Sequence, residues 1–258
     1  MSDGGSLLYL HGIEGSYIKE TEVKVLGYAN GGYVLDRTIL HYQGGGIPSG
    51  SSTLVLGSYG AGKTTMGIHF AHRGALNGEN VVYFTLEERK EGIILASKSY
   101  NTDVTPYLDK NLFLLNPDTV EFVELLKSEG NFKASIESLK PKRIVIDSIS
   151  LILMVAENDV LKRNVIINLS NALRDLNVTS FLLAESNVSI PYSSRDGLAE
   201  FVSDGVISLQ NRYDDNIGST TSIIRVLKMR LTNHDRKARP YSIGSNGIEI
   251  LAKSELFQ

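Results

Sequence analysis

One short segment combines glycine, lysine and hydroxyl side chains at a spacing typical of phosphate binding. It fits the pattern G-x-x-x-x-G-K-[ST] and reads Gly57-Ser58-Tyr59-Gly60-Ala61-Gly62-Lys63-Thr64-Thr65. Glycines in such a loop let the backbone wrap closely round a polyphosphate with its N–H groups pointing inward. Lys63 would contact the β- and γ-phosphates, and the Thr64 hydroxyl would ligate Mg²⁺. The segment from Ser58 to Thr65 is therefore predicted to bind a nucleoside triphosphate.

The residues on either side supply the elements that such a loop needs. Residues 52–56 form an apolar, β-branched run that predicts a strand, and residues 66–76 have helical character. A phosphate-binding loop must join a strand to a helix N-terminus, whose partial positive charge adds to anion binding. The flanking sequence therefore favours a nucleotide-binding loop over a chance glycine-rich turn.

A carboxylate is predicted to complete the Mg²⁺ site. Asp147 closes a strand predicted at residues 144–147. In proteins with this loop, an acid at the end of a buried strand holds the Mg²⁺ shell through water, which is the Walker B role. Asp147 could instead only cap the following element. Because the glycine-rich loop lies upstream, we favour Thr64 and Asp147 as metal ligands.

Two adjacent glutamates, Glu87 and Glu88, follow the strand predicted over residues 81–86. Ligands of open α/β sheets bind at the carboxyl ends of the strands. Hydrolysis of a triphosphate needs a group that orients and deprotonates water, and a carboxylate there would serve. The pair could instead only place favourable charge at the start of a helix. The chain lacks the Asn-Lys-x-Asp pattern associated with guanine, which favours ATP.

Strand-like and helix-like segments alternate along most of the chain. Strands are predicted at residues 52–56, 81–86, 112–115, 144–147 and 180–185, and helices at 66–76, 89–100, 118–127 and 160–176. This alternation predicts an α/β fold with a mostly parallel sheet covered on both sides. After about residue 200, strand-like segments follow without long helices, at 205–209, 222–231 and 241–251. They predict an antiparallel C-terminal extension of the sheet.

The composition is that of a globular protein with no dominant charge. The 258 residues are 42% hydrophobic and 21% charged, and the net charge of −3 does not indicate nucleic acid or an anionic membrane as a partner. The absence of cysteine excludes disulfides and thiolate metal sites and suits a cytoplasmic protein. No apolar run is long enough to span a membrane. We expect one domain at residues 44–258, preceded by an extension at 1–43 of unassigned structure that could add a strand to this sheet or to a neighbouring subunit.

Five blocks of the sequence together resemble the KaiC-like branch of the RecA-type ATPases, which includes RadA-paralogue types. The blocks are Gly44-Gly45-Gly46-Ile47-Pro48-Ser49-Gly50, Thr85-Leu86-Glu87-Glu88, Val145-Ile146-Asp147-Ser148, Glu200-Phe201-Val202-Ser203-Asp204-Gly205 and Leu227-Lys228-Met229-Arg230-Leu231-Thr232-Asn233-His234. They occur in family order between about residues 44 and 250. The resemblance implies a RecA-like core and a hexameric ring with ATP held between subunits. It also implies that Glu87 is the general base and Glu88 its partner.

The chain departs from the family pattern at several positions. Of the short motifs that usually precede the glycine-rich turn in this family, only Leu35-Asp36 is recognisable. Further along the chain, Leu231 replaces the glycine that usually follows the Lys-x-Arg pair. The clock proteins of this family phosphorylate an adjacent Ser-Thr pair, and the corresponding positions here are Glu200-Phe201. Because the chain also has no second repeat, a self-phosphorylating clock is not expected.

Two cations of the C-terminal region are candidates for catalysis. Lys228 and Arg230 alternate with Leu227, Met229 and Leu231 on a predicted strand, so the cations are expected to project together, away from an apolar core face. From spacing alone they could serve their own nucleotide, a neighbour's nucleotide or only solvent. The family resemblance favours the neighbour's.

Further basic residues leave two other functions open. The run from Arg225 to Arg239 could be a solvated face, a phosphate contact across a subunit interface or a nucleic-acid contact. Arg195, near Tyr192, lies in the loop where RecA-type recombinases bind DNA. The favoured interpretation is a ring ATPase, a motor or switch that acts on an unidentified protein partner. The alternatives are a recombination modulator that binds single-stranded DNA and a nucleotide-gated scaffold with little turnover.

Overall fold

The computed structural model describes residues 47–214, 218–230 and 234–251. The strands are β1 (Ser52–Gly57), β2 (Val81–Thr85), β3 (Leu112–Leu115), β4 (Arg143–Asp147), β5 (Thr179–Glu185), β6 (Gly205–Asp214), β7 (Ser219–Met229), β8 (Arg239–Gly244) and β9 (Gly247–Ile250). The α-helices are α3 (Lys63–Leu76), α4 (Lys90–Ser99), α5 (Thr119–Lys127), α6 (Asn131–Ile136), α7 (Ile149–Val155), α8 (Asp159–Asp175) and α9 (Ala199–Val202). Short 3-10 helices are η2 (Thr105–Tyr107) and η3 (Glu137–Leu139).

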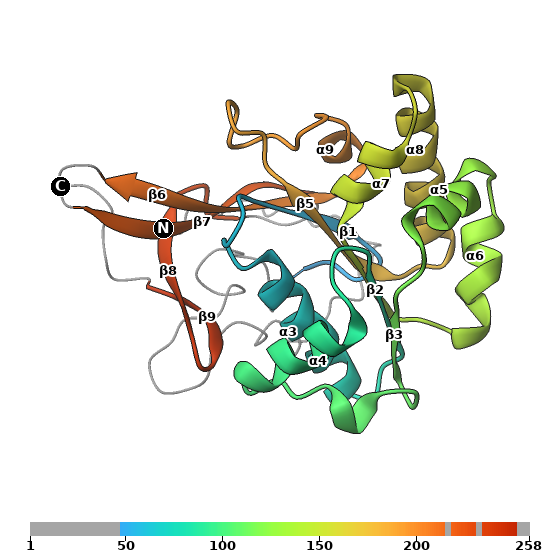
Figure 1. The fold of residues 1–258 in the computed structure, drawn as a ribbon, viewed down its shortest axis with the longest axis horizontal. Coiled ribbons are helices and arrows are strands. Elements are labelled where there is room, and N and C mark those ends of the chain that lie inside the picture. Colours follow the sequence, from blue (N-terminus) through green and yellow to red (C-terminus); the bar gives the residue numbers. More distant parts are fainter. Residues whose placement is uncertain (1–46, 215–217, 231–233, 252–258) are drawn as a thin grey trace, which may run out of the picture.

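In the described part of the chain, the strands form one sheet in the order β3-β2-β4-β5-β1-β6-β7-β8-β9 (Figure 1). The neighbours from β3 to β6 are parallel, and those from β6 to β9 are antiparallel. Strands β1, β2 and β4 are buried along their whole length, as expected for parallel strands covered on both faces. The predicted α/β class with a mostly parallel sheet and an antiparallel C-terminal extension is confirmed.

Helices cover the two faces of the sheet in separate layers (Figure 1). Alternate residues of each strand point to opposite faces, so β1 directs Val55 toward α3 and α4 and Leu54 toward α5, α7 and α8. The two resulting cores lie on either side of the sheet. Helix α5 begins where the sequence predicts, because the Asp118 side chain accepts hydrogen bonds from the first free N–H groups of the helix.

The C-terminal strands differ from the prediction in two details. Strand β6 runs parallel to β1, so the antiparallel extension begins only at β7. The strand-like segment predicted at 241–251 is a hairpin, in which β8 and β9 pair antiparallel around a turn at residues 245–246. A run of strand-forming residues does not show where the chain reverses, and Ser245-Asn246 supplies that turn.

The predicted shared core face of Leu227 and Met229 is wrong. The pairing of β6 with β7 shifts register, because Val206 pairs with Lys228 while Ile207 pairs with Val226. Leu227 is therefore the extra residue of a β-bulge, and it packs on the α8 side of the sheet while Met229 is buried on the α3 side. A bulge of one residue reverses the faces on its two sides, and Leu231 lies outside the described residues.

No helix within residues 47–214, 218–230 and 234–251 has the length and apolar character needed to cross a membrane. The extended segment predicted within residues 1–43 lies outside the described residues.

Candidate nucleotide-binding site

The predicted phosphate-binding loop joins β1 to α3 at the carboxyl edge of the sheet. Gly60 and Gly62 have positive φ angles of 70° and 87°, a backbone conformation that glycine adopts without steric cost. Gly62 is also the N-cap of α3, and in the described structure no side chain caps this helix N-terminus. The first N–H groups of α3 can therefore bind an anion, with the helix dipole in support.

The Lys63 ammonium lies over the loop in which it occurs. Its Nζ donates hydrogen bonds of 3.0 Å to the carbonyl oxygens of Gly57 and Ser58. Burial lowers the pKa of Lys63, and three nearby carboxylates oppose this shift. These carboxylates belong to Glu87, Glu185 and Asp147. The cation is thus surrounded by acids from the ends of three different segments, where a polyphosphate would meet it.

Asp147 is the last residue of β4 and is buried, with 3% of its surface exposed. Its Oδ2 accepts a 2.8 Å hydrogen bond from the hydroxyl of Tyr83, and the Thr64 side chain is a second hydrogen-bond partner. Burial raises the pKa of Asp147 from 3.8 to about 6, although both hydrogen bonds act in the opposite direction. A carboxylate beside a threonine hydroxyl is a set of oxygen ligands suited to Mg²⁺, which takes its remaining ligands from water and phosphate. The residues present therefore fit the predicted metal.

The two predicted catalytic glutamates have different surroundings. The Ser148 hydroxyl donates a hydrogen bond to Oε1 of Glu87, so that carboxylate is held beside the end of β4. The Oε2 of Glu88 lies over the first turn of α4, 3.0 Å from where a Cβ at Gly92 would be. Glu88 therefore lies at the start of α4, whereas Glu87 faces the loop and the proposed metal-site carboxylate.

Glu185 is a site residue that the sequence analysis did not identify. It is the last residue of β5, its N–H donates a 2.8 Å hydrogen bond to Oγ of Ser150, and its charge acts on Lys63. The sequence held a signal for this residue, because Glu185 is an acid at the carboxyl end of a buried strand, as Asp147 is. What the sequence did not show is that β5 lies next to β1, with Glu185 in register with Gly57.

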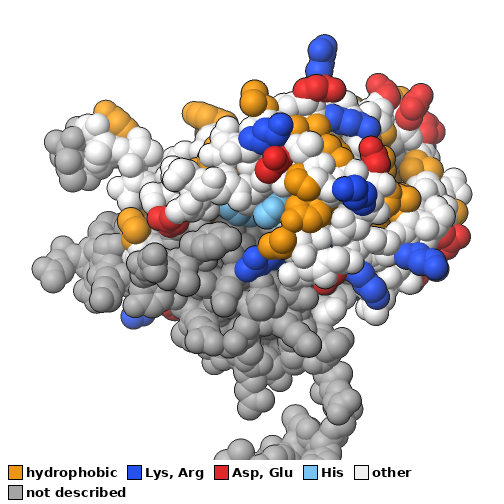
Figure 2. Space-filling view, turned by 90° about the horizontal axis from the view of Figure 1, so that it is seen from below, with side chains coloured by type: hydrophobic (Ala, Val, Ile, Leu, Met, Phe, Trp, Pro, Cys, Tyr) orange, Lys and Arg blue, Asp and Glu red, His pale blue; other side chains and the backbone are white. Residues whose placement is uncertain are grey.

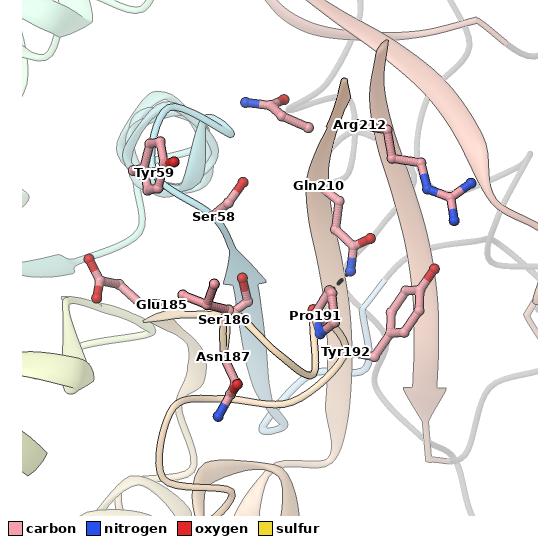
Figure 3. Close-up of a pocket in the computed structure, with 11 residues that line it drawn as sticks. Ser58, Tyr59, Glu185, Ser186, Asn187, Pro191, Tyr192, Gln210 and Arg212 are labelled. Carbon is pink, nitrogen blue, oxygen red and sulfur yellow. Dashed lines mark hydrogen bonds between the residues drawn. The ribbon is translucent and has the colours of Figure 1, made fainter. Parts of the chain in front are cut away.

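A pocket of about 400 Å³ opens beside the loop (Figure 3). It lies between the loop, the segment after β5 and strand β6, and its lining includes Tyr59, Glu185, Asn187, Tyr192 and Arg212. The Gln210 side chain donates a 2.8 Å hydrogen bond to the carbonyl of Pro191, which ties β6 to the segment after β5. The pocket therefore shares residues with the nucleotide site but extends away from α3.

Comparisons with known proteins identify the family. The family model described as the KaiC ATPase matches residues 31–255. The chain belongs to the KaiC family of ATPases. It is 32% identical over 223 residues to the circadian clock oscillator protein KaiC of Prochlorococcus marinus, covering 81% of this chain and 42% of that protein. It is also 32% identical over 219 residues to that of Parathermosynechococcus lividus, covering 80% of this chain and 39% of that protein.

A solved structure agrees with this assignment. The crystal structure of a KaiC-like protein from the hyperthermophilic archaeon Pyrococcus horikoshii OT3 superposes with a TM-score of 0.74 at 29% identity, covering 92% of this chain and 99% of that chain. The RecA-type KaiC-like fold is thus shown. The chain spans about two fifths of the length of the curated KaiC relatives named above.

In this KaiC family member, Lys228 and Arg230 lie at the edge of the sheet opposite the loop. Arg230 donates through its backbone N–H to the carbonyl of Asp204, whose own N–H donates to Ser52 at the start of β1. The loop begins at the far end of β1, about 16 Å away at the usual rise per residue. An arginine side chain does not span that distance, so the structure does not bring these cations to the loop of the same chain.

Both cations also have partners within the chain. Lys228 donates to the carbonyl oxygens of Glu200 and Ser203 at 3.0 and 2.5 Å, and burial, followed by the charge of Arg230, lowers its pKa. Arg230 pairs with Asp204 at 3.2 Å, with 51% of its side chain exposed. Lys228 thus holds the end of α9, whereas Arg230 stands at the surface.

Other basic residues of the C-terminal run are dispersed. Arg239 pairs with Asp235 at 2.5 Å, and the guanidinium of Arg225 lies 5.6 Å from the ring centroid of Tyr192. Where described residues form the face in Figure 2, basic and acidic side chains are interspersed. Within the described part of the run, Arg239 and Arg225 therefore have separate partners, an acid and an aromatic ring.

The hairpin of β8 and β9 supports the loop in a way the sequence analysis missed. The hydroxyl of Tyr241 donates a 2.6 Å hydrogen bond to the carbonyl of Ala61. A Cβ at Gly62 would lie 2.6 Å from Cδ1 of Ile243. The glycine therefore allows the hairpin to pack directly against the loop, and the C-terminal strands help to fix its conformation.

Proposed function

We propose that this chain binds ATP with Mg²⁺ at the loop of residues 57–65 and hydrolyses it with Glu87 as the general base. The observation that carries the proposal is the placement of Glu87, tied to Ser148 and acting on Lys63 together with Asp147. In this arrangement the α3 N-terminus and Lys63 bind the phosphates, and Thr64 and Asp147 hold the metal. Bound Mg²⁺ would neutralise charge that develops on the phosphate oxygens. Glu87 would orient the attacking water and accept its proton, with Glu88 as its partner.

We further propose that the chain assembles into a hexameric ring in which each nucleotide lies between two subunits. Lys228 and Arg230 lie at the edge of the sheet opposite the loop. Phe201, which follows the Glu200 whose carbonyl accepts a hydrogen bond from Lys228, is 77% exposed. A head-to-tail contact places one edge of a subunit on the opposite edge of the next, and it forms a ring where the rotation between subunits closes. Arg230 could then leave Asp204 and meet the neighbour's γ-phosphate, and Lys228 could act beside it.

The role of a motor or switch with a protein partner in the cytoplasm is part of the same proposal. Residues 44–258 would form the ATPase domain, and residues 1–43 an extension of it.

The contacts of Glu200 favour a function of the chain other than self-phosphorylation. The Glu200 carboxylate accepts hydrogen bonds from the Ser193 and Ser194 hydroxyls at 3.0 and 2.6 Å. It thereby anchors the segment after β5.

One observation favours the alternative of single-stranded DNA binding. Arg225 lies over Tyr192 at the rim of the pocket beside the loop, and single strands bind to aromatic rings combined with cations. A strand bound there would contact the segment after β5 and could influence the nucleotide site through Glu185.

Steady-state ATP hydrolysis, measured with and without single-stranded DNA, separates these functions. Basal turnover that DNA leaves unchanged supports the motor or switch, and stimulation by DNA supports the recombination modulator. ATP binding without turnover would contradict hydrolysis and support a scaffold. The mass of the assembly with and without ATP tests the ring, and a monomer under both conditions would contradict it.

A further inference from the structure

Tyr83 lies in the middle of β2 with only 1% of its surface exposed. In the pairing of β2 with β4, Tyr83 is opposite Val145, and Thr85 is opposite Asp147. The phenol therefore reaches along the sheet to the carboxylate, where its hydroxyl donates the 2.8 Å hydrogen bond to Oδ2 of Asp147. A buried aromatic ring fills space without help, but a buried hydroxyl needs a partner. This partner is the proposed metal-site carboxylate.

Helix α3 leaves room for this hydroxyl. A Cβ at Gly67 would lie 3.2 Å from the Tyr83 hydroxyl oxygen and 3.0 Å from Cδ1 of Leu183. Gly67 follows Lys63 and Thr64 by about one helical turn, so it lies directly below the phosphate-binding end of α3. The absence of a side chain at this position lets α3 approach the sheet, with the hydroxyl between the helix backbone and Asp147.

The hydrogen bond has a definite direction. The Tyr83 hydroxyl carries the hydrogen and an ionised carboxylate can only accept, so the phenol is the donor and Oδ2 of Asp147 the acceptor. A carboxylate that accepts a hydrogen bond on Oδ2 is restricted in its rotation. Its remaining lone pairs then point in fixed directions, and the Thr64 side chain is a second hydrogen-bond partner of the same carboxylate.

We propose that Tyr83 is a positioning residue that fixes the orientation of the Asp147 carboxylate for Mg²⁺ bound with ATP. This inference rests on the proposed function, because it takes Asp147 as part of the metal site. Hydrogen bonds to metal ligands from such outer residues typically account for 10- to 100-fold in metal affinity. Phenylalanine at position 83 would fill the same space but would leave Asp147 without this donor.

The test is a titration of Mg²⁺ against the full chain mixed with a fluorescent ATP analogue. In Tyr83→Phe, the Mg²⁺ concentration for half-maximal nucleotide binding should rise about 10-fold or more, while nucleotide binding in EDTA stays unchanged. Tyr107→Phe is the matched control, because the Tyr107 ring packs against His72 away from the loop. This control should leave the Mg²⁺ midpoint unchanged. Circular dichroism shows whether each variant is folded.

Two further variants keep the inference testable if Tyr83→Phe does not fold. Gly67→Ala retains the phenol but crowds its hydroxyl, and should also raise the Mg²⁺ midpoint. In an Asp147→Asn background, Tyr83→Phe should cause little further change, because the proposed effect passes through the carboxylate. An unchanged midpoint in the folded variants, or an equal effect of Tyr83→Phe with and without Asp147, would overturn the inference. A wild-type chain that binds ATP without any dependence on Mg²⁺ would instead overturn the proposed metal site, and the inference with it.

Discussion

The hydroxyl of Ser148 donates a hydrogen bond to the carboxylate of Glu87. Ser148 directly follows β4, and Glu87 lies two residues after the end of β2. A backbone hydrogen bond of 2.6 Å from the N–H of Leu86 to the carbonyl of Asp147 supports the contact between them. The proposed base and the proposed metal-site carboxylate are therefore fixed relative to one another by two neighbouring strands. This relationship distinguishes Glu87 from Glu88 and leads to specific expectations.

Lys63→Ala should abolish or strongly weaken ATP binding, because it removes the cation that is proposed to contact the β- and γ-phosphates. Isothermal titration calorimetry with ATP measures the effect directly. Lys98→Ala, on the exposed side of α4, is a suitable control and should bind normally. Affinity near that of the wild type in Lys63→Ala would contradict the assignment of the phosphate-binding loop.

Glu87→Gln should retain ATP binding but slow hydrolysis by about 10²-fold or more, the range expected when a general base is lost. Glu88→Gln should have a smaller effect, since that carboxylate lies over the start of α4. Single-turnover hydrolysis of both variants gives the comparison. If Glu88→Gln is the slower variant, the roles of the two glutamates are reversed. If neither is slow, the base is a different residue, for which Glu185 is the next candidate.

Asp147→Asn should change how the stability of the nucleotide-free chain depends on pH. The pKa of Asp147 is about 6 in the folded chain, against 3.8 for an ordinary aspartate, so between these values the folded state holds more protons than the unfolded state. The free energy of unfolding of the wild type therefore falls as pH rises through this window. From pH 5 to pH 7, Asp147→Asn should gain about 1.4 kcal/mol relative to the wild type.

Urea unfolding in EDTA at the two pH values measures that difference. Asp175→Asn, at the exposed end of α8, is the control and should parallel the wild type. A constant difference between Asp147→Asn and the wild type at both pH values would show that the folded-state pKa of Asp147 is not raised.

Arg230→Ala should keep ATP binding but lose most turnover, by about 10³-fold or more if Arg230 acts as an arginine finger. Folding should be little affected, because the pair with Asp204 is half exposed and such pairs contribute little to stability. Arg174→Ala, on the exposed side of α8, controls for loss of a surface cation. Turnover near the wild-type rate in Arg230→Ala would remove this residue from the mechanism.

Mixing Arg230→Ala chains with Glu87→Gln chains should restore part of the activity. The proposed base and finger come from different subunits, so an interface that combines Glu87 of one variant with Arg230 of the other is intact. Hydrolysis is measured after dissociating and reassembling the two variants together, and native mass spectrometry verifies that the assemblies are mixed. Mixed assemblies without any recovery would show that Arg230 does not act across the interface.

The sequence by itself determined the candidate phosphate-binding loop, the alternation of the parallel strands with their helices and the class of the fold. These features follow from local signals: the spacing of Gly57, Gly62 and Lys63, and apolar runs that end in Asp147 or precede Glu87. Such signals act over a few residues and depend little on the rest of the chain. The C-terminal bulge at Leu227 and the turn at Ser245-Asn246 were not predicted, because periodicity does not show where a strand changes register or direction.

The tertiary structure decided which of these residues act together. The strand order places β5 beside β1, so Glu185 joins the site, and it places β2 beside β4, so that Tyr83 and Ser148 reach across to Asp147 and Glu87. It also places Arg230 at the edge opposite the loop. Contacts between residues more than sixty positions apart depend on which strands pair, and strand pairing is set by the packing of the whole sheet rather than by any one segment.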